Sequence, residues 1–356
     1  MNNIERIQQK LEEKDLDGVL IIDEKDQRFA AGFPFTDGVV LVTRNRAILM
    51  TDSRYIEAAG KTVPDSVELV LFGRERKLAA LLRETVRVCG LKRLGAEEQK
   101  LSYGAYLAYE NILGLRLTPA QSLFSELRAA KTPDEVDCMV KAQRIAEKAL
   151  DDVLGLIRPG LSEREIAAEL NYRMMKYGAE GISFDTIAIT GKKTSMPHGV
   201  PGDEKVACGD FVTMDFGCIK YGYCSDMTRT VAVGSATDEM KKVYETVLEA
   251  QKVGIAAARA GIPGGEIDAA ARDVIDQAGY GAYFGHSFGH SLGLDIHEMP
   301  VAAPGASAIM PVGCMVSAEP GIYIPGAFGV RIEDVLLLKE GGCEDITQAP
   351  KQLTIL

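Results

Sequence analysis

Hydrophobic positions recur with helical and strand periods along the whole chain, and their pattern changes near residue 130. In the first part, Ile4, Ile7 and Leu11 form a helical stripe after Asn2, a residue type that favours a helix start. Short apolar runs and longer helix-like segments then alternate. The runs that predict strands are 18–22, 38–43, 47–51 and 68–72, and the segments that predict helices are 75–88 and 103–111. This alternation predicts a small α/β domain over residues 1–126, in which we identify no candidate site.

Strong helix-start signals open the second part, residues 127–356. Thr132-Pro133-Asp134-Glu135 combines an N-cap threonine, a first-turn proline and a glutamate placed for a capping box. Apolar residues follow at helical spacing until Arg158-Pro159-Gly160. Ser162-Glu163-Arg164-Glu165 then begins a second helix, which we expect to end at Gly178.

The stretch at 212–233, VTMDFGCIKYGYCSDMTRTVAV, has the pattern of a β-hairpin that carries two acidic residues. Two apolar, β-branched runs flank a glycine-containing centre. A simple hairpin with its midpoint between Lys220 and Tyr221 places Asp215 opposite Asp226, with Cβ atoms roughly 5 Å apart. Buried carboxylates at that distance repel each other unless a cation lies between them.

A second hairpin with two acids is predicted at 316–338. Its glycine- and proline-rich centre has Gly326 as its midpoint, so that Glu319 faces Glu333. Asp215 and Glu319 are 104 positions apart, and upstream segments recur at the same offset. Asp134-Glu135 recurs as Asp238-Glu239, and Pro159-Gly160 recurs as Pro263-Gly264. We interpret this as an internal repeat, which predicts two pseudo-symmetric halves that each offer a carboxylate pair to a central site.

Composition and charge exclude several classes of function. The 356 residues are 46% hydrophobic and 26% charged, as in ordinary soluble proteins, and they suffice for two domains. A net charge of −11 without a basic block argues against nucleic-acid and anionic-membrane partners. The charged N-terminus does not resemble a signal peptide, and no apolar run is long enough to span a membrane.

Cysteine usage favours a cytoplasmic protein. The seven cysteines are an odd number, and none of them form a CxxC spacing. We interpret them as reduced thiols. A disulfide between Cys218 and Cys224, near the first predicted turn, is the less favoured alternative.

The four histidines of the chain all lie between or beside the two acidic hairpins. They are His198, in SMPHGVP, and His286, His290 and His297, in FGHSFGHSLGLDIHEMP. A single histidine is usually structural, and a single pair of aspartates beside a turn is usually solvated. Together, four carboxylates and an imidazole match the ligands that hard divalent ions prefer, and two such ions balance four negative charges. A site of this kind activates water for hydrolysis.

Several segments of the chain resemble the pita-bread metallopeptidases. These segments are EGISFDTIAITG, MPHGVP, MDFG with YCSDMTRTV, FGHSFGHSLGLDIHE and EPGIYIPGAFGVRIED. Within that family they are most similar to the Xaa-Pro peptidases, prolidase and aminopeptidase P. The segments GFPFTDGVVLVT and TDSRYIEAA resemble the creatinase-type N-terminal domain. The resemblance implies an α/β (α+β) fold, with a creatinase-type domain at 1–126 and a pseudo-twofold pita-bread catalytic domain at 127–356.

The resemblance also implies a set of metal ligands. These would be Asp215, Asp226, His290, Glu319 and Glu333, with Asp226 and Glu333 bridging two divalent ions. Asp215 would complete the coordination of one ion, and His290 with Glu319 that of the other. The family uses Mn, Co or Zn, of which we expect Mn.

Further residues receive roles from the same resemblance. His198 and His297 would orient the substrate and stabilise the tetrahedral intermediate, and Glu319 would accept a proton from the attacking water. His286, Tyr323 and Arg331 would lie on the substrate side. The implied activity is hydrolysis of the Xaa-Pro bond at the N-terminus of dipeptides or short peptides, by a cytoplasmic homodimer.

Four alternatives to this prediction differ in substrate or chemistry. An aminopeptidase P would act on longer Xaa-Pro peptides. A non-catalytic binding module and a creatinase-like hydrolase without metal are both disfavoured, because all five ligand positions are intact. A methionine aminopeptidase shares the fold but usually lacks the N-terminal domain, and the MPHGVP and EPGIYIP segments are more similar to the proline-specific branch.

Overall fold

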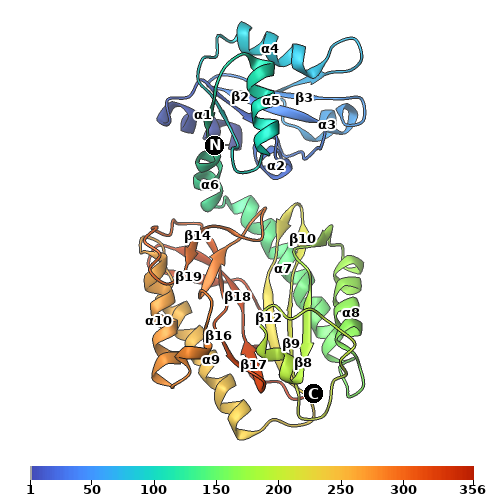
Figure 1. The fold of residues 1–356 in the computed structure, drawn as a ribbon, viewed down its shortest axis with the longest axis vertical. Helices are drawn as coiled ribbons and strands as arrows, with labels where there is room; N and C mark the ends of the chain where they lie inside the picture. Colours follow the sequence, from blue (N-terminus) through green and yellow to red (C-terminus); the bar gives the residue numbers. More distant parts are fainter. Residues whose placement is uncertain (1) are drawn as a thin grey trace. The chain divides into compact units, whose positions relative to one another are not determined.

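Figure 1 shows the computed structural model of the chain, which describes residues 2–356. The chain forms two compact units, of which the first ends at Arg128 and the second covers Ala129–Leu356.

The first unit is a six-stranded mixed sheet with helices. Its strands lie in the order β4-β3-β2-β1-β5-β6, with β2 antiparallel to both β1 and β3, and the pairs β3–β4, β1–β5 and β5–β6 parallel. Its elements are α1 (Asn3–Glu13), β1 (Gly18–Ile21), α2 (Glu24–Ala31), β2 (Gly38–Thr43), β3 (Ala47–Thr51), α3 (Ile56–Thr62), β4 (Val67–Leu71), α4 (Leu78–Val88), β5 (Leu94–Ala96), α5 (Tyr103–Leu113), β6 (Leu117–Pro119) and α6 (Gln121–Ala129).

The elements predicted from sequence in this unit are all present. The α1 helix begins with a capping box between Asn2 and Glu5, and its stripe of Ile4, Ile7 and Leu11 is buried. No pattern in the sequence predicted β5 and β6, whose three residues are too few to show alternation, nor the short helices α2, α3 and α6.

The second unit repeats the order helix, helix, hairpin. Its first half contains α7 (Pro133–Leu154), α8 (Glu163–Lys176), β7 (Gly181–Ile182), β8 (Ile187–Thr190), a 3₁₀ turn (Gly191–Ser195), β9 (Phe211–Phe216), β10 (Cys218–Lys220), β11 (Tyr223–Cys224) and β12 (Met227–Ala232). Its second half contains α9 (Asp238–Ala257), α10 (Gly264–Gln277), a 3₁₀ turn (Gly281–Tyr283), β13 (Gly289–Ser291), β14 (Glu298–Ala302), β15 (Met315–Ala318), β16 (Gly321–Ile324), β17 (Phe328–Arg331), β18 (Asp334–Lys339) and β19 (Gly342–Asp345).

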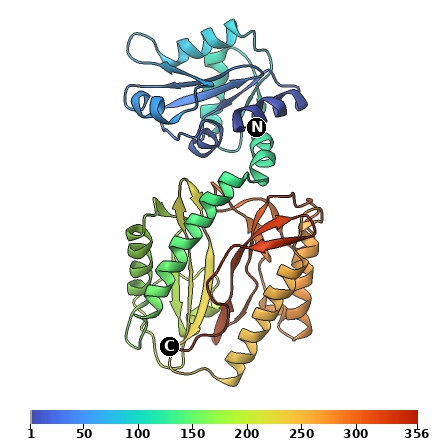
Figure 2. The same cartoon turned by 180° about the vertical axis from the view of Figure 1, so that it is seen from behind.

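The long helices of this unit cover one face of its sheets. In Figure 2, α7 runs across the strands of the first half and α9 across those of the second. Apolar residues of α7 and α8 pack against Val212 and Met214 of β9, whereas residues of α9 pack with Ile322 and Val330. Because side chains alternate along a strand, Asp215 projects to the other face, away from α7 and α8. The helices therefore leave that face free for polar residues.

The register of the first hairpin differs from the predicted one. Thr228, not Asp226, is the partner of Asp215, because the strands turn at Tyr221-Gly222, beyond the predicted midpoint. Both turn residues have positive φ angles, 52° and 81°, which is typical of a tight type I′ turn. Asp226 precedes Thr228 by two positions, so it lies on the same side of the hairpin as Asp215, as a diagonal neighbour.

The second hairpin has the predicted register. Ala318 pairs with Asp334 on one side of the acidic pair, and Gly321 pairs with Arg331 on the other. Continuing this register places Glu319 opposite Glu333. An isolated bridge between Thr228 and Glu333 joins the two hairpins, so that the acids of both halves meet at the centre of the unit.

Two other expectations concern the cysteines and the membrane. All seven cysteines are free, so the alternative of a Cys218–Cys224 disulfide is wrong. The turn pairs Ile219 with Cys224 and leaves the two cysteines out of register. In the part of the chain that the structure describes, no helix is long and apolar enough to cross a membrane.

Candidate metal centre

A cavity of about 480 Å³ in the second unit contains most of the residues predicted for the site. Nine of the ten predicted side chains line it, and Tyr323 lies behind its wall. The nine are His198, Asp215, Asp226, His286, His290, His297, Glu319, Arg331 and Glu333. Apolar side chains, among them Phe184, Ile187, Met299 and Val301, cover much of the remaining wall.

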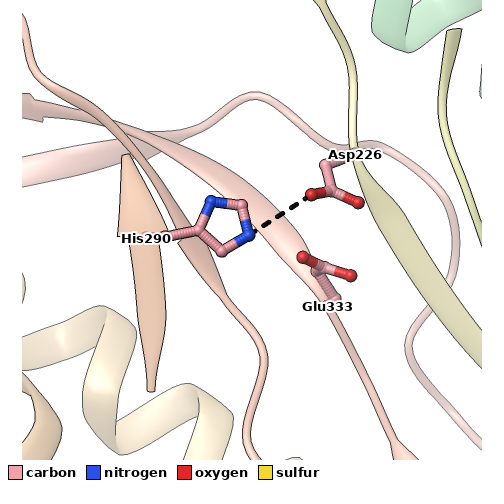
Figure 3. Close-up of side chains that lie close together, drawn as sticks. All are labelled: Asp226, His290 and Glu333. Atoms are coloured by element: carbon pink, nitrogen blue, oxygen red, sulfur yellow. Dashed lines mark ion pairs between the residues drawn. The ribbon is translucent and has the colours of Figure 1, made fainter. Parts of the chain in front are cut away.

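Three of these side chains converge closely (Figure 3). Ligand atoms of Asp226, His290 and Glu333 all lie within 4.8 Å of one another. Asp226 directly precedes β12, His290 lies in β13, and Glu333 directly precedes β18. The group therefore draws its members from both halves of the unit.

The other two predicted ligands lie at the edge of this group. Oε1 of Glu319 is 3.4 Å from Nε2 of His290, which is also 3.6 Å from Oδ2 of Asp226. Oδ2 of Asp215 accepts a hydrogen bond from Nη2 of Arg331 at 2.5 Å. The second oxygen of Asp215, Oδ1, is buried and has no hydrogen-bond partner in residues 2–356.

Burial of several acids together shifts their protonation. Desolvation, followed by the charges of neighbouring acids, raises the pKa of Asp226 and of Glu333 well above the usual range. Burial likewise raises the pKa of Glu319 to about 7. Without a cation, these carboxyl groups therefore favour their protonated forms.

The chemistry of the donor set fits a divalent cation. Nδ1 of His290 lies 3.2 Å from the carbonyl oxygen of Ser291 and can donate its proton there, which leaves the lone pair of Nε2 facing two carboxylates. Burial lowers the pKa of His290, which favours this neutral form. A histidine held in this way by a backbone carbonyl is typical of metal sites, and the orphaned Oδ1 of Asp215 offers a further donor.

A hydrogen-bonded chain joins His286, Tyr323 and Arg331. Nη1 of Arg331 donates to the Tyr323 hydroxyl at 2.7 Å, and this hydroxyl is 2.8 Å from Nε2 of His286. Since the hydroxyl accepts from Arg331, its own proton points to His286. Burial and the nearby charge of Arg331 lower the pKa of His286 to about 4, which is consistent with a neutral ring.

The remaining two histidines are exposed at the cavity. The ring of His297 meets that of His290 edge to face, with centroids 4.4 Å apart. Partial burial, followed by the charges of His290 and His198, lowers the pKa of His297. His198 lies in the loop after the first 3₁₀ turn and also lines the cavity. Both rings can reach a molecule bound in the cavity.

Sequence reasoning missed two buried hydroxyl groups that hold the acids in place. Oγ1 of Thr228 donates to Glu333 at 2.7 Å and accepts from Nε of Arg331 at 3.1 Å. Oγ of Ser317 donates to Glu319 at 2.9 Å and accepts from the backbone N–H of His290. Each is two positions from a candidate ligand, so the alternation of strand side chains is the signal that points to them.

Gln143 is a third residue that sequence reasoning missed. It is fully buried on α7, and its Oε1 accepts a hydrogen bond from the backbone N–H of Asp226 at 3.4 Å. Its Nε2 is buried without a partner among the described residues. A single glutamine on a long helix has no local pattern that distinguishes it, so only the fold identifies it.

Two family models together cover nearly the whole chain. Residues 3–130 match the creatinase/prolidase N-terminal domain, and residues 137–340 match metallopeptidase family M24. The second match includes every residue of the candidate centre.

Similar proteins extend along the full chain. An uncharacterised peptidase of Bacillus subtilis, YqhT, is 40% identical over 99% of both chains. The solved structure of an Xaa-Pro dipeptidase from Bacillus anthracis is 42% identical, with a TM-score of 0.95 and 99% of both chains covered. That of an X-Pro aminopeptidase from Thermotoga maritima is 34% identical, with a TM-score of 0.91, covering 98% of this chain and all of the other. From its motifs, its fold and these similarities, the chain belongs to metallopeptidase family M24, a membership that implies divalent metal ions, and it carries the creatinase/prolidase N-terminal domain.

Proposed function

We propose that the protein is a metal-dependent exopeptidase that hydrolyses the Xaa-Pro bond at the N-terminus of dipeptides or short peptides. The convergence of Asp226, His290 and Glu333 within 4.8 Å, in a cavity large enough for a small peptide, is the observation that carries this proposal. The similarity to an Xaa-Pro dipeptidase over 99% of the chain supports the proline-specific substrate.

The proposed ligand set combines these three residues with two more. Asp226 and Glu333 would contact both ions, Asp215 would complete the coordination of one, and His290 with Glu319 that of the other. Bound divalent ions would supply Lewis-acid polarisation of the substrate carbonyl and a water nucleophile at neutral pH. The raised pKa values of Asp226 and Glu333 support this arrangement, because they reflect first the burial of these acids and then the charges of neighbouring acids, both of which a bound cation would offset.

The chain's own residues would handle protons and orientation. Glu319 would accept the proton of the attacking water, because its carboxylate lies beside His290 in the group of candidate ligands. The exposed rings of His198 and His297 would donate hydrogen bonds to the substrate carbonyl oxygen and to the charge that develops on it. His286, Tyr323 and Arg331 would form the substrate side.

The identity of the metal and the assembly are part of the same proposal. A site with four carboxylates and one imidazole suits Mn, with Co or Zn as alternatives. We also propose a cytoplasmic homodimer with a functional division into residues 1–126 and 127–356. The net charge of −11 and the free cysteines support a cytoplasmic enzyme without nucleic-acid or membrane partners.

One observation favours peptides longer than dipeptides as a second candidate. Arg331 is the only lysine or arginine among the described residues that line the cavity. Its guanidinium already donates to Asp215, Tyr323 and Thr228. The cavity wall therefore offers no unpaired lysine or arginine to the free carboxylate of an Xaa-Pro dipeptide. In a longer peptide the proline carries no free carboxylate, so no such cation is required.

A set of matched substrates tests the proposal. The Mn-loaded protein would be assayed on an Xaa-Pro dipeptide, its C-terminal amide, an Xaa-Pro-Yaa tripeptide and an Xaa-Ala dipeptide, each with a chelated control. We expect metal-dependent cleavage before proline and little cleavage of Xaa-Ala. Preference for the free dipeptide would indicate a dipeptidase, and preference for the amide and tripeptide an aminopeptidase. Metal-loaded protein that cleaves none of the proline substrates would refute the proposal.

A further inference from the structure

We infer that a buried ion pair between Arg229 and Asp334, closed by the C-terminal segment 346–356, positions the two acidic hairpins that form the metal centre. The inference rests on the proposed metal site. It assigns a positioning role to residues that do not line the cavity and to a segment that lies beyond the family match, which ends at residue 340.

Arg229 occupies the back of the hairpin that carries Asp226. It follows Thr228, whose hydroxyl faces Glu333, so its own side chain leaves the opposite face of the strand. Its guanidinium uses all five of its N–H groups. The acceptors are the carbonyl oxygens of Thr228 at 2.9 Å, Glu333 at 2.7 Å, Ala349 at 2.6 Å and Pro350 at 2.8 Å, and Oδ1 of Asp334 at 2.7 Å.

Two of these acceptors connect the halves of the metal centre directly. The carbonyls of Thr228 and Glu333 belong to the residues that form the isolated bridge between the hairpins. A planar guanidinium holds its acceptors at fixed directions, which the single ammonium of lysine does not. Arg229 therefore fixes the backbone of Glu333 relative to β12.

Asp334 anchors the other end of this contact. It is fully buried directly after Glu333, and its Oδ2 accepts from Nζ of Lys351 at 2.6 Å and from Nε2 of Gln251 at 2.9 Å. Nε2 of Gln251, on α9, also lies 3.1 Å from the carbonyl oxygen of Ala318 and 3.3 Å from that of Ile332. These carbonyls precede Glu319 and Glu333, so both acids of the second hairpin are held from behind.

The C-terminal segment crosses from the second half to the first. It starts on β18, where the N–H of Ile346 donates to the carbonyl of Val335, and it ends beside β12, where Ala232 pairs with Ile355. Between these points the Tyr244 hydroxyl of α9 donates to the carbonyl of Lys351. In Figure 2 the chain runs from the second half to its end beside the strands of the first. The C-terminal segment thus covers Arg229 where the two halves of the unit meet.

The energetics favour a geometric role for the ion pair. Removing two charges from water costs several kcal/mol per ion, so a buried ion pair is weak grounds for stability alone. Apolar residues of similar volume would fill the space at least as well. Only the charged pair makes directed hydrogen bonds to both hairpins and to the C-terminal segment. These bonds fix the distance between the hairpins, and the shared ligands Asp226 and Glu333 require a fixed distance to bind the same ions.

A cobalt titration of the metal-free protein tests this inference without relying on activity. The variant is Arg229→Lys, which keeps the positive charge and loses the planar guanidinium with its five N–H donors. The probe is Co²⁺, followed by its visible absorption, with circular dichroism to establish that the protein is folded. We expect two equivalents in the wild type, and in the variant a loss of affinity for at least one of them of about 10–100-fold, as for other residues that orient metal ligands.

The matched control is Arg173→Lys, which alters an ion pair with Asp152 between α8 and α7 and touches neither hairpin. It should bind cobalt as the wild type does. The second variant lacks residues 353–356, which pair with β12, and it should also bind cobalt more weakly than the wild type. It provides the test if Arg229→Lys does not fold. If folded Arg229→Lys binds cobalt with wild-type affinity, the inference is overturned. If Arg229→Lys does not fold, wild-type cobalt affinity in the folded deletion variant overturns it instead. A wild type that binds no cobalt would instead refute the proposed metal site.

Discussion

At the scale of single residues, the candidate centre concentrates buried negative charge. Asp226 and Glu333 are 3% and 2% exposed. Among the described residues that line the cavity, Arg331 is the one lysine or arginine. Isolated carboxylates in such a place either take up protons or require cations.

Removing a candidate shared ligand should abolish both binding and turnover. We expect Asp226→Asn or Glu333→Gln to lower metal affinity by more than about 100-fold, beyond the effect usual for residues that merely orient ligands. Metal analysis of the purified variants and their peptidase rate measure this. The control Asp137→Asn alters an exposed acid of α7 and should change neither. Wild-type turnover in Asp226→Asn or Glu333→Gln would remove these residues from the ligand set.

His297 should affect rate without affecting metal content. Its ring is exposed at the cavity and contacts His290 only edge to face, so His297→Ala leaves the five candidate ligands in place. We expect kcat to fall by about 10²–10⁴-fold, as on loss of a group that donates a proton or hydrogen bond to the reacting atoms. Metal content near that of the wild type should accompany this loss. A large drop in bound metal would instead make His297 part of the ligand scaffold.

The metal-free protein should lose stability as pH rises. Burial raises the pKa of Glu319 from 4.5 to about 7, and the pKa values of Asp226 and Glu333 shift in the same direction. Between the unfolded and folded pKa values the folded state holds more protons, so its free energy of unfolding falls as pH rises from about 5 to about 8. The Tm of chelated protein should therefore be lower at pH 8 than at pH 5.5.

Two comparisons isolate the cause of that pH dependence. Glu319→Gln removes one titrating group and should flatten the decrease in Tm of the chelated protein. Excess Mn²⁺ should raise Tm most at pH 8, where metal competes with fewer protons. A Tm of chelated wild-type protein that stays constant or rises between pH 5.5 and pH 8 would contradict the raised pKa values.

The paired acids and the histidines of the cavity stand out in the sequence, and the family resemblance selects the candidate ligands among them, whereas the supporting residues do not stand out. Paired acids and the four histidines stand out because their residue types and spacing are unusual, and nine of the ten predicted residues line one cavity. Strand alternation places Thr228 and Ser317 on the same side as a candidate ligand, but hydroxyl residues are common in strands, so this signal alone does not single them out. Their roles depend on which atoms the fold brings within hydrogen-bond distance.

At the scale of elements, the two hairpins show how far turn chemistry can be read from sequence. The register of the second hairpin was predicted correctly, because its acids are placed evenly around Gly326. The first was predicted wrongly, because symmetry around Lys220 and Tyr221 was assumed and the turn forms at Tyr221-Gly222. Its acids are diagonal as a result, and both remain on one side of the hairpin.

This turn should be important for the position of Asp226. Gly222 has a φ angle of 81°, which a β-branched residue adopts only with strain. We expect Gly222→Val to lower the free energy of unfolding by about 1–2 kcal/mol and to weaken metal binding. Gly222→Asn, whose side chain tolerates this conformation, should remain near the wild type in both. Denaturant unfolding and metal titration measure the two effects, and an unchanged Gly222→Val would mean that the turn does not set the register.

At the scale of the whole molecule, the internal repeat predicted two halves, and the second unit repeats the order helix, helix, hairpin. What the repeat did not indicate is how the halves are joined. The bridge between Thr228 and Glu333, the ion pair of Arg229 with Asp334 and the contacts of the C-terminal segment join the two halves. Residues more than 100 positions apart meet there, and no local pattern encodes such pairs.

The most direct test of the account is anomalous diffraction from crystals of the Mn-loaded protein. We predict two anomalous peaks in the cavity, about 3.5–4 Å apart, as in other two-metal hydrolytic sites. Asp226 and Glu333 should contact both peaks, Asp215 one of them, and His290 with Glu319 the other. No peak in the cavity, or a single peak with Asp215 still bonded only to Arg331, would contradict the two-metal centre on which the proposed peptidase activity depends.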